Sequence, residues 1–170
     1  RIIGFHGCER NVRDEIVNGK SDLKTSNNSY DWLGNGMYFW EQNLERAWQW
    51  ARSSSKIKEP AVLGAVMDLG NCLNLLDSRC IDILRSQYDV FVEESKIFGN
   101  KIPQNRNVGS NKDLLLRYLD CAIIQHLHRF RKDNDLPQFD SVRGMFVEGG
   151  EIYKGSGFMD KSHIQICVRN

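Results

Sequence analysis

The chain has 170 residues, of which 41% are hydrophobic, and this is enough to bury one sizeable core, so we expect a single domain spanning residues 1–170. Its 23 basic and 22 acidic side chains nearly cancel, which excludes a global field that would draw the protein to nucleic acid, a membrane or an acidic partner. The five cysteines lack the close pairing of zinc or redox motifs and no apolar run reaches the roughly 18 residues of a membrane span, so we expect a cytoplasmic protein with reduced thiols, no metal and no membrane partner.

The first half of the chain alternates strands and helices joined by glycine-containing turns. Short β-branched or aromatic runs indicate strands, and apolar residues at three- and four-residue spacing indicate helices. Asn43 is placed to cap the start of one helix, and Gly19 the end of another. In chain order we expect a strand at 1–6, a helix at 11–18, a loop at 20–30, a glycine turn and a strand at 31–40, a helix at 43–53 and a strand at 61–69. The last of these is apolar throughout, which predicts a central position in the sheet.

The second half predicts two longer helices followed by two strands. Residues 71–76 extend or follow the preceding strand. After them we expect a helix at 78–88, a polar loop at 99–111, a helix at 112–131, a strand at 141–147, a glycine-rich loop at 149–160 and a strand at 163–168.

Three segments far apart in the sequence each place a polar or aromatic side chain on a short strand. They are His6-Gly7, the run from Gly34 to Phe39, and the run from His163 to Gln165. Alone, a histidine on an apolar strand is usually a satisfied core residue, and a glycine–asparagine–glycine triplet occurs in many hairpins. The order of the three segments along one chain points instead to a shared site.

In these motifs and their order, the chain resembles the ADP-ribosyltransferase superfamily, in the branch of poly-ADP-ribose polymerases and diphtheria-type toxins that has a His, Tyr, Glu signature. In that family a strand-borne His-Gly pair is followed by a glycine turn and a strand reading Gly-x-Tyr-Phe, then by a helix and a core strand. The resemblance implies an α+β fold: a split, mostly antiparallel sheet of about six strands around a cleft for NAD, with helices on its outer faces.

The resemblance also implies roles for individual residues. His6 would hydrogen-bond the ribose of the nicotinamide half, the Gly7 backbone would hold the carboxamide, and Tyr38 would stack on the nicotinamide ring. NAD⁺ carries a cationic pyridinium, so an electron-rich aromatic face binds it more tightly than it binds neutral nicotinamide. Glycine at Gly7, and at Gly36 in the turn before Tyr38, lets the backbone approach the ligand where a Cβ would obstruct it.

The last strand of the family carries a glutamate, and here the sequence departs from the pattern. His163 and Gln165 occupy this strand and point to one face, from which either can contact the ribose or the acceptor. Neither replaces a carboxylate, which stabilises the positive charge of an oxocarbenium-like ribose. The preceding loop contains Glu148 and Glu151, of which we expect Glu148 to enter the cleft. The predicted catalytic residues are His6, Tyr38, Glu148 and Gln165, and the predicted NAD-binding residues are His6, Gly7, Gly36, Tyr38 and His163.

The resemblance implies transfer of a single ADP-ribose unit from NAD to a macromolecule, a glycosyltransferase reaction in which NAD is the substrate. We expect a bacterial toxin or phage-defence effector that acts on a protein or a nucleic acid, with a cognate antitoxin as a partner. Two alternatives stay open. One is a module that binds NAD or ADP-ribose without catalysis, which the missing strand glutamate supports, and the other is an NAD glycohydrolase that passes the ribose to water.

Several conspicuous side chains have plainer explanations. Phe39 alternates with Tyr38 and is expected in the core. The four tryptophans are expected to pack in the protein rather than to stack on bases. His126 and His128 share one helix but do not share a face, so we expect core or surface positions for them rather than a metal site.

Overall fold

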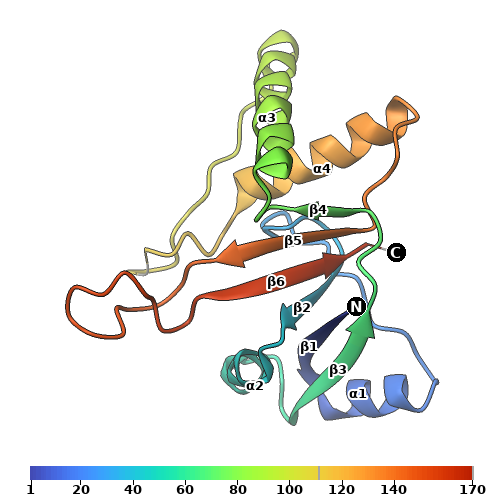
Figure 1. The fold of residues 1–170 in the computed structure, drawn as a ribbon, viewed down its shortest axis with the longest axis vertical. Helices are drawn as coiled ribbons and strands as arrows, with labels where there is room; N and C mark the ends of the chain where they lie inside the picture. The colour runs from blue at the N-terminus through green and yellow to red at the C-terminus, as the bar shows by residue number, and fades with distance from the viewer. Residues whose placement is uncertain (111, 170) are drawn as a thin grey trace.

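The computed structural model describes residues 1–110 and 112–169, which form a mixed α+β fold with one six-stranded sheet and four helices (Figure 1). At this level the expected fold class is confirmed. The elements are, in chain order, β1 (Ile2–Glu9), α1 (Arg10–Val17), β2 (Met37–Glu41), α2 (Leu44–Ser53), β3 (Pro60–Met67), β4 (Cys72–Asn74), α3 (Ser78–Phe98), α4 (Tyr118–Asp133), β5 (Ser141–Phe146) and β6 (His163–Val168). The predicted loop at 99–111 and the predicted domain at 1–170 each end on a residue outside the described part of the chain.

The strands lie in the order β3-β1-β2-β6-β5-β4, and all neighbours are antiparallel except β4 and β5. The prediction of a mostly antiparallel sheet is therefore confirmed. The predicted central position of the strand at 61–69 is wrong, because β3 forms an edge of the sheet. Helices α1 and α2 pack against this strand, while Val66 near its end is 71% exposed.

The main core lies between α4 and the sheet. Ile124 and Leu127 of α4 pack with Val142 of β5, Cys167 of β6 and Leu33 from the turn before β2, and all five side chains are buried. Helices α3 and α4 lie beside the β5–β4 end of the sheet, whereas α1 and α2 lie beside the β3–β1 end (Figure 1). No helix among the described residues is long and apolar enough to cross a membrane.

Local signals set the ends of the helices. The side chain of Asn43 accepts a hydrogen bond from the amide of Arg46 at 3.0 Å, which confirms the predicted cap of α2. Helix α3 continues past its predicted end at Tyr88. The residue that ends it is Gly99, whose φ of 67° is the left-handed conformation typical of a helix C-terminus.

The sheet opens between β1 and β2. Their pairing stops at Phe5↔Trp40, whereas β1 pairs with β3 along its whole length. The carbonyl of Ile3 accepts from the amide of Gln42 at 2.9 Å, and alternate residues of an antiparallel strand turn their backbone groups to the same neighbour. The amide and carbonyl of Gly7 therefore face β2, beyond the last residue pair of this ladder.

Candidate functional site

A cleft of about 670 Å³ lies beside this opening, bordered by His6 of β1 and Tyr38 of β2. Its volume falls in the range of roughly 300–1,000 Å³ that small-molecule sites occupy. All the predicted site residues line it except Gly7. They are His6, Gly36, Tyr38, Glu148, His163 and Gln165.

The ring of His6 spans the gap between β1 and β2. Its Nδ1 lies 2.8 Å from the carbonyl oxygen of Tyr38, and because a carbonyl only accepts, Nδ1 carries the proton. Burial lowers the pKa of His6, so the ring is neutral at pH 7. Its Nε2 is then a hydrogen-bond acceptor, which suits a ligand hydroxyl.

The ring of Tyr38 is fixed by the turn that precedes β2. Its hydroxyl donates to the carbonyl of Gly34 at 2.7 Å and accepts from the amide of Leu33 at 3.0 Å. Burial raises the pKa of Tyr38, so the hydroxyl stays protonated. The cleft is therefore bordered by an aromatic ring whose orientation is set before any ligand binds.

Gly7 packs on α2 and is outside the set of described residues that line the cleft. A Cβ at this position would lie 2.6 Å from the carbonyl oxygen of Ala47 and 3.1 Å from the ring of Trp50. The close approach of α2 is therefore sufficient to require glycine here. The predicted reason, contact with a ligand, is not needed to explain the residue.

Gln165 presents a donor and no charge. Its Oε1 accepts from the indole Nε1 of Trp32 at 2.7 Å. Because an indole N–H only donates, the amide turns its oxygen to Trp32 and keeps its NH₂ group for other acceptors. Gln165 as a whole is 8% exposed, so this orientation is enclosed by the protein.

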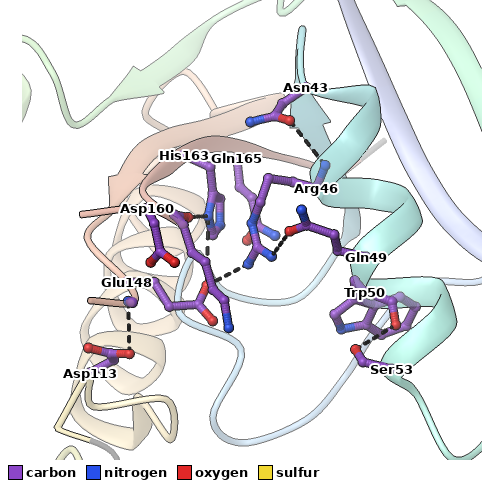
Figure 2. A network of polar contacts seen from close by, with 12 residues as sticks. Asn43, Arg46, Gln49, Trp50, Ser53, Asp113, Glu148, Asp160, His163 and Gln165 are labelled. Atoms are coloured by element: carbon purple, nitrogen blue, oxygen red, sulfur yellow. Dashed lines mark hydrogen bonds and ion pairs between the residues drawn. The ribbon is translucent and has the colours of Figure 1, made fainter. Parts of the chain in front are cut away.

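The carboxylate of the cleft belongs to Glu148, in the segment that follows β5. Figure 2 shows Arg46 reaching from α2 to this carboxylate, with His163 close by. Arg46 donates to Oε2 of Glu148 at 2.7 Å, and Nδ1 of His163 lies 3.8 Å from the same oxygen. The side chains of Arg46 and Glu148 are 12% and 19% exposed, so the ion pair is largely shielded from water.

Two other carboxylates near the cleft serve local structure. Asp31 lines the cleft, but its side chain accepts from the amide of Asn28 at 2.8 Å in the loop before β2. Glu151 accepts from the amide of Gly155 at 2.8 Å and does not line the cleft. Glu148 is thus the carboxylate best placed to act on a ligand.

The ring of His163 is enclosed by its neighbours. Its Nδ1 lies 2.7 Å from the carbonyl oxygen of Lys161. The ring stacks on Phe146 with centroids 5.7 Å apart and planes 6° apart, and the ring of Trp40 lies 6.2 Å away. Burial lowers the pKa of His163, so the ring is neutral with its proton on Nδ1 and its lone pair on Nε2.

The aromatic lining of the cleft and the position of Arg46 were not predicted from the sequence. Trp32, Trp40 and Trp50 line the cleft, and the indole nitrogen of Trp40 is buried with no hydrogen-bond partner in the described part of the chain. Arg46 belongs to α2 and also lines the cleft. It stands one helical turn before Trp50, so both side chains turn to the cleft, and this spacing was the signal available in the sequence.

His126 and His128 of α4 are both buried, in agreement with a core position. His126 contacts Gln87 at 2.7 Å and Glu94 at 2.9 Å. Neither ring nitrogen of His128 has a hydrogen-bond partner among the described residues, and burial, with the nearby positive charges, lowers the pKa of His128 to about 3. Among the residues described, no group of three His, Cys, Asp or Glu side chains is arranged to hold a metal ion.

The fold and the cleft define an α+β protein with a ligand-sized cleft beside a split in its sheet. No protein-family model matches the chain, and no solved structure matches it. A protein of Methanocaldococcus jannaschii, described as uncharacterized protein MJ0359, is 22% identical over 193 residues, an alignment that covers 100% of this chain and 83% of the archaeal protein.

Proposed function

We propose that the cleft binds NAD and that the chain transfers the ADP-ribose of NAD to a macromolecular acceptor, as a mono-ADP-ribosyltransferase with a split-sheet transferase fold. One observation carries the proposal. His6, Tyr38 and Glu148, which are far apart in the sequence, line one cleft of about 670 Å³ where two strands separate. This is the arrangement that the resemblance implies for an NAD site.

The nicotinamide half of NAD is matched by groups on β1 and β2. The fixed ring of Tyr38 suits a cationic pyridinium, which an aromatic face attracts more strongly than a neutral ring. The free acceptor nitrogen of His6 suits a ribose hydroxyl. Gly7 lies outside the described cleft lining, but its amide and carbonyl face the gap next to His6, beyond the β1–β2 ladder, and in this proposal they pair with the carbonyl and the NH₂ group of the carboxamide.

The diphosphate and adenine are matched by the rest of the lining. Lys24, Lys56 and Arg46 border the cleft, and cationic side chains form charge-assisted hydrogen bonds with phosphate oxygens. Tyr30 and Trp50 also border it and are 37% and 44% exposed. Aromatic rings in such positions suit a stacked base.

The reaction requires a negative charge beside the ribose, because the bond to nicotinamide breaks through an oxocarbenium-like state. Gln165 carries no charge, and the carboxylate of Asp31 accepts a hydrogen bond from the amide of Asn28. We therefore assign the role to Glu148, which Arg46 keeps oriented at 2.7 Å. A carboxylate at the ribose contributes more to the transition state than to the bound substrate, so its loss is expected to lower kcat.

The acceptor is a protein or a nucleic acid in this proposal, approached by the segment from 147 to 162. This segment projects beyond β5 and β6 (Figure 1) and exposes Tyr153 and Phe158, at 62% and 68%. Exposed aromatic side chains of this kind suit contact with a partner. We propose an effector that acts in the bacterial cytoplasm, as a toxin or in phage defence, and that a cognate antitoxin restrains.

A module that binds NAD or ADP-ribose without catalysis is the second candidate. Two observations on the charges of the cleft favour it. Gln165 stands on the strand where the family carries a glutamate, and the carboxylate of Glu148 is already paired with Arg46. A glycohydrolase would use the same cleft with water as the acceptor. The products of the reaction separate these three activities.

The test is incubation of the protein with NAD labelled in its adenylate half, together with bacterial protein, RNA or DNA in separate reactions. Nicotinamide release and label incorporation are both followed. The proposal predicts label in one of the three pools. Release without incorporation identifies a glycohydrolase, and binding of NAD with neither signal identifies the binding module. No NAD binding at all contradicts the proposal.

Matched variants test the assignment of the cleft. Tyr38→Ala removes the aromatic face and is expected to weaken NAD binding by about 1–2 kcal/mol, roughly five- to thirtyfold. Tyr88→Ala on α3, where the side chain is 41% exposed outside the cleft, is the control and leaves NAD affinity unchanged. Equal affinity in both folded variants, measured by calorimetry, contradicts the site.

A further inference from the structure

The end of the cleft that holds His163 adjoins the projecting segment. Along β6, His163 precedes Gln165 by two residues, on the same face of the strand and roughly 7 Å further along it. His163 is paired with Phe146, the last residue of β5, and Glu148 follows Phe146 at the start of the segment from 147 to 162. A macromolecular acceptor that contacts this segment reaches His163 as it enters the cleft.

The protonation state of His163 is set by its contacts. The carbonyl of Lys161 accepts from Nδ1 at 2.7 Å, so the proton stays on Nδ1 and the basic lone pair is on Nε2. Stacking on Phe146 fixes the plane of the ring. The side chain is 4% exposed and lines the cleft. A neutral, oriented imidazole in a cleft is the arrangement of a general base.

The charged groups around the ring shift the pKa of His163 in opposite directions. Glu148, in the segment after β5, lies 3.8 Å from Nδ1 and favours the imidazolium, as does the Lys161 carbonyl. Arg46 of α2 opposes it, and Arg117, before α4, lies 4.6 Å over the Phe146 ring that stacks on His163. With burial as the largest effect, the pKa of His163 is lowered. The ring is therefore a free base at neutral pH.

We propose that His163 is a catalytic base that takes the proton from a neutral O–H or N–H nucleophile of the acceptor, and that Glu148 stabilises the resulting imidazolium. The proposal rests on the ADP-ribosyl transfer proposed above. The lone pair of the nucleophile forms a bond to C1′ of the ribose, and the bond from C1′ to nicotinamide breaks, so that its electron pair neutralises the pyridinium. The proton of the nucleophile passes to Nε2 of His163 and then to water.

This step restricts the class of acceptor. A carboxylate has no proton to lose at neutral pH and needs no base. A hydroxyl, an amide or the amino group of a nucleobase holds its proton more tightly, so its reaction is accelerated by a general base. The acceptor is therefore expected to be a hydroxyl or nitrogen nucleophile, and the linkage that forms is expected to resist neutral hydroxylamine, which cleaves ADP-ribose esters of carboxylates. Release of the label by hydroxylamine overturns this part of the proposal.

The first experiment compares wild type, His163→Asn and His163→Ala in the transfer assay. Asn keeps a side-chain donor for the Lys161 carbonyl but has no basic nitrogen, so both variants are expected to lose about 10²–10⁴-fold in transfer rate. In His163→Ala, added imidazole is expected to restore the rate at least about tenfold, whereas pyrazole, of similar shape and far weaker basicity, is expected to restore none. Full activity in His163→Asn, or equal rescue by both compounds, overturns the base.

The pH profile separates this proposal from the one on which it rests. As the pH falls below the lowered pKa of His163, the wild-type rate is expected to fall tenfold per pH unit because the ring gains its proton, and the residual rate of His163→Asn is expected to lack this dependence. Wild-type protein that neither binds nor consumes NAD contradicts the proposed function itself. Wild-type transfer with an unchanged rate and pH profile in a folded His163→Asn contradicts only the base.

Discussion

The ion pair between Arg46 and Glu148, which both line the cleft, is expected to stabilise the folded protein. Replacing Arg46 with Met removes a donor 2.7 Å from a carboxylate whose side chain is only 19% exposed. At that separation the Coulomb energy is about 6 kcal/mol for an effective dielectric of about 20, and desolvation of both charges offsets most of it. Removing one partner of a fully buried pair costs about 3–5 kcal/mol, and because this pair is partly exposed we expect a smaller cost, about 2–3 kcal/mol.

A double-mutant cycle measures this coupling. Arg46→Met alone is expected to lower the midpoint of thermal unfolding by about 5–10 °C for a chain of this size. The double variant Arg46→Met with Glu148→Met leaves no unpaired charge and is expected to lie within about 1 kcal/mol of wild type. Urea unfolding of the four proteins gives the cycle. A loss below about 0.5 kcal/mol in Arg46→Met, or additive effects in the double variant, refutes the pairing.

Three further outcomes follow from individual contacts. Asn43→Ala removes the cap of α2 and is expected to lower the free energy of unfolding in urea by about 1 kcal/mol. An unchanged free energy of unfolding would show that the cap does not contribute to stability. Trp32→Phe keeps an aromatic ring but leaves the Oε1 of Gln165 without its donor, at a cost of about 1–3 kcal/mol, whereas Trp48→Phe outside the cleft serves as the control. The folded pKa of His128, about 3, lies below its unfolded value of 6.5, so the unfolded chain takes up the proton first and stability is lost as the pH falls below about 6.5. Between pH 7 and pH 5 this amounts to about 2 kcal/mol, and an equal pH dependence in His128→Phe refutes it.

The local features of the fold were predictable because nearby residues set them. The strand at 163–168 has the predicted bounds, since its side chains alternate, and α2 begins after the residue predicted as its cap. The predicted start of α4, at Lys112, was too early, because the apolar spacing typical of a helix extends back to that region. Leu116 instead exchanges hydrogen bonds with Arg106 at 2.8 and 3.1 Å, and Leu114 takes a φ of 50°. Such a bridge depends on a segment about ten residues away and has no helical or strand period.

The candidate site was predictable where glycine and an aromatic residue share one short strand. His6 and Tyr38 stand in such runs, and both line the cleft. Arg46 and Trp50 stand on a helix, where the sequence shows which residues share a face but not what that face contacts. The position of α2 beside the cleft depends on tertiary packing, so the sequence did not show that Arg46 and Trp50 line the cleft.

The position of the carboxylate shows why a glutamate missing from one strand need not be missing from a cleft. In the sequence Glu148 stands at the start of the projecting segment and His163 directly after its end, yet β5 and β6 are antiparallel neighbours with Phe146 paired to His163. A carboxylate just past the end of β5 therefore comes within 3.8 Å of the first residue of β6. In an antiparallel pair, moving an acidic residue from one strand to its neighbour changes its place in the chain by the length of the connection but shifts it by only about 5 Å in space. The charge that the ribose requires is for this reason better sought on both strands of the pair than on the last strand alone.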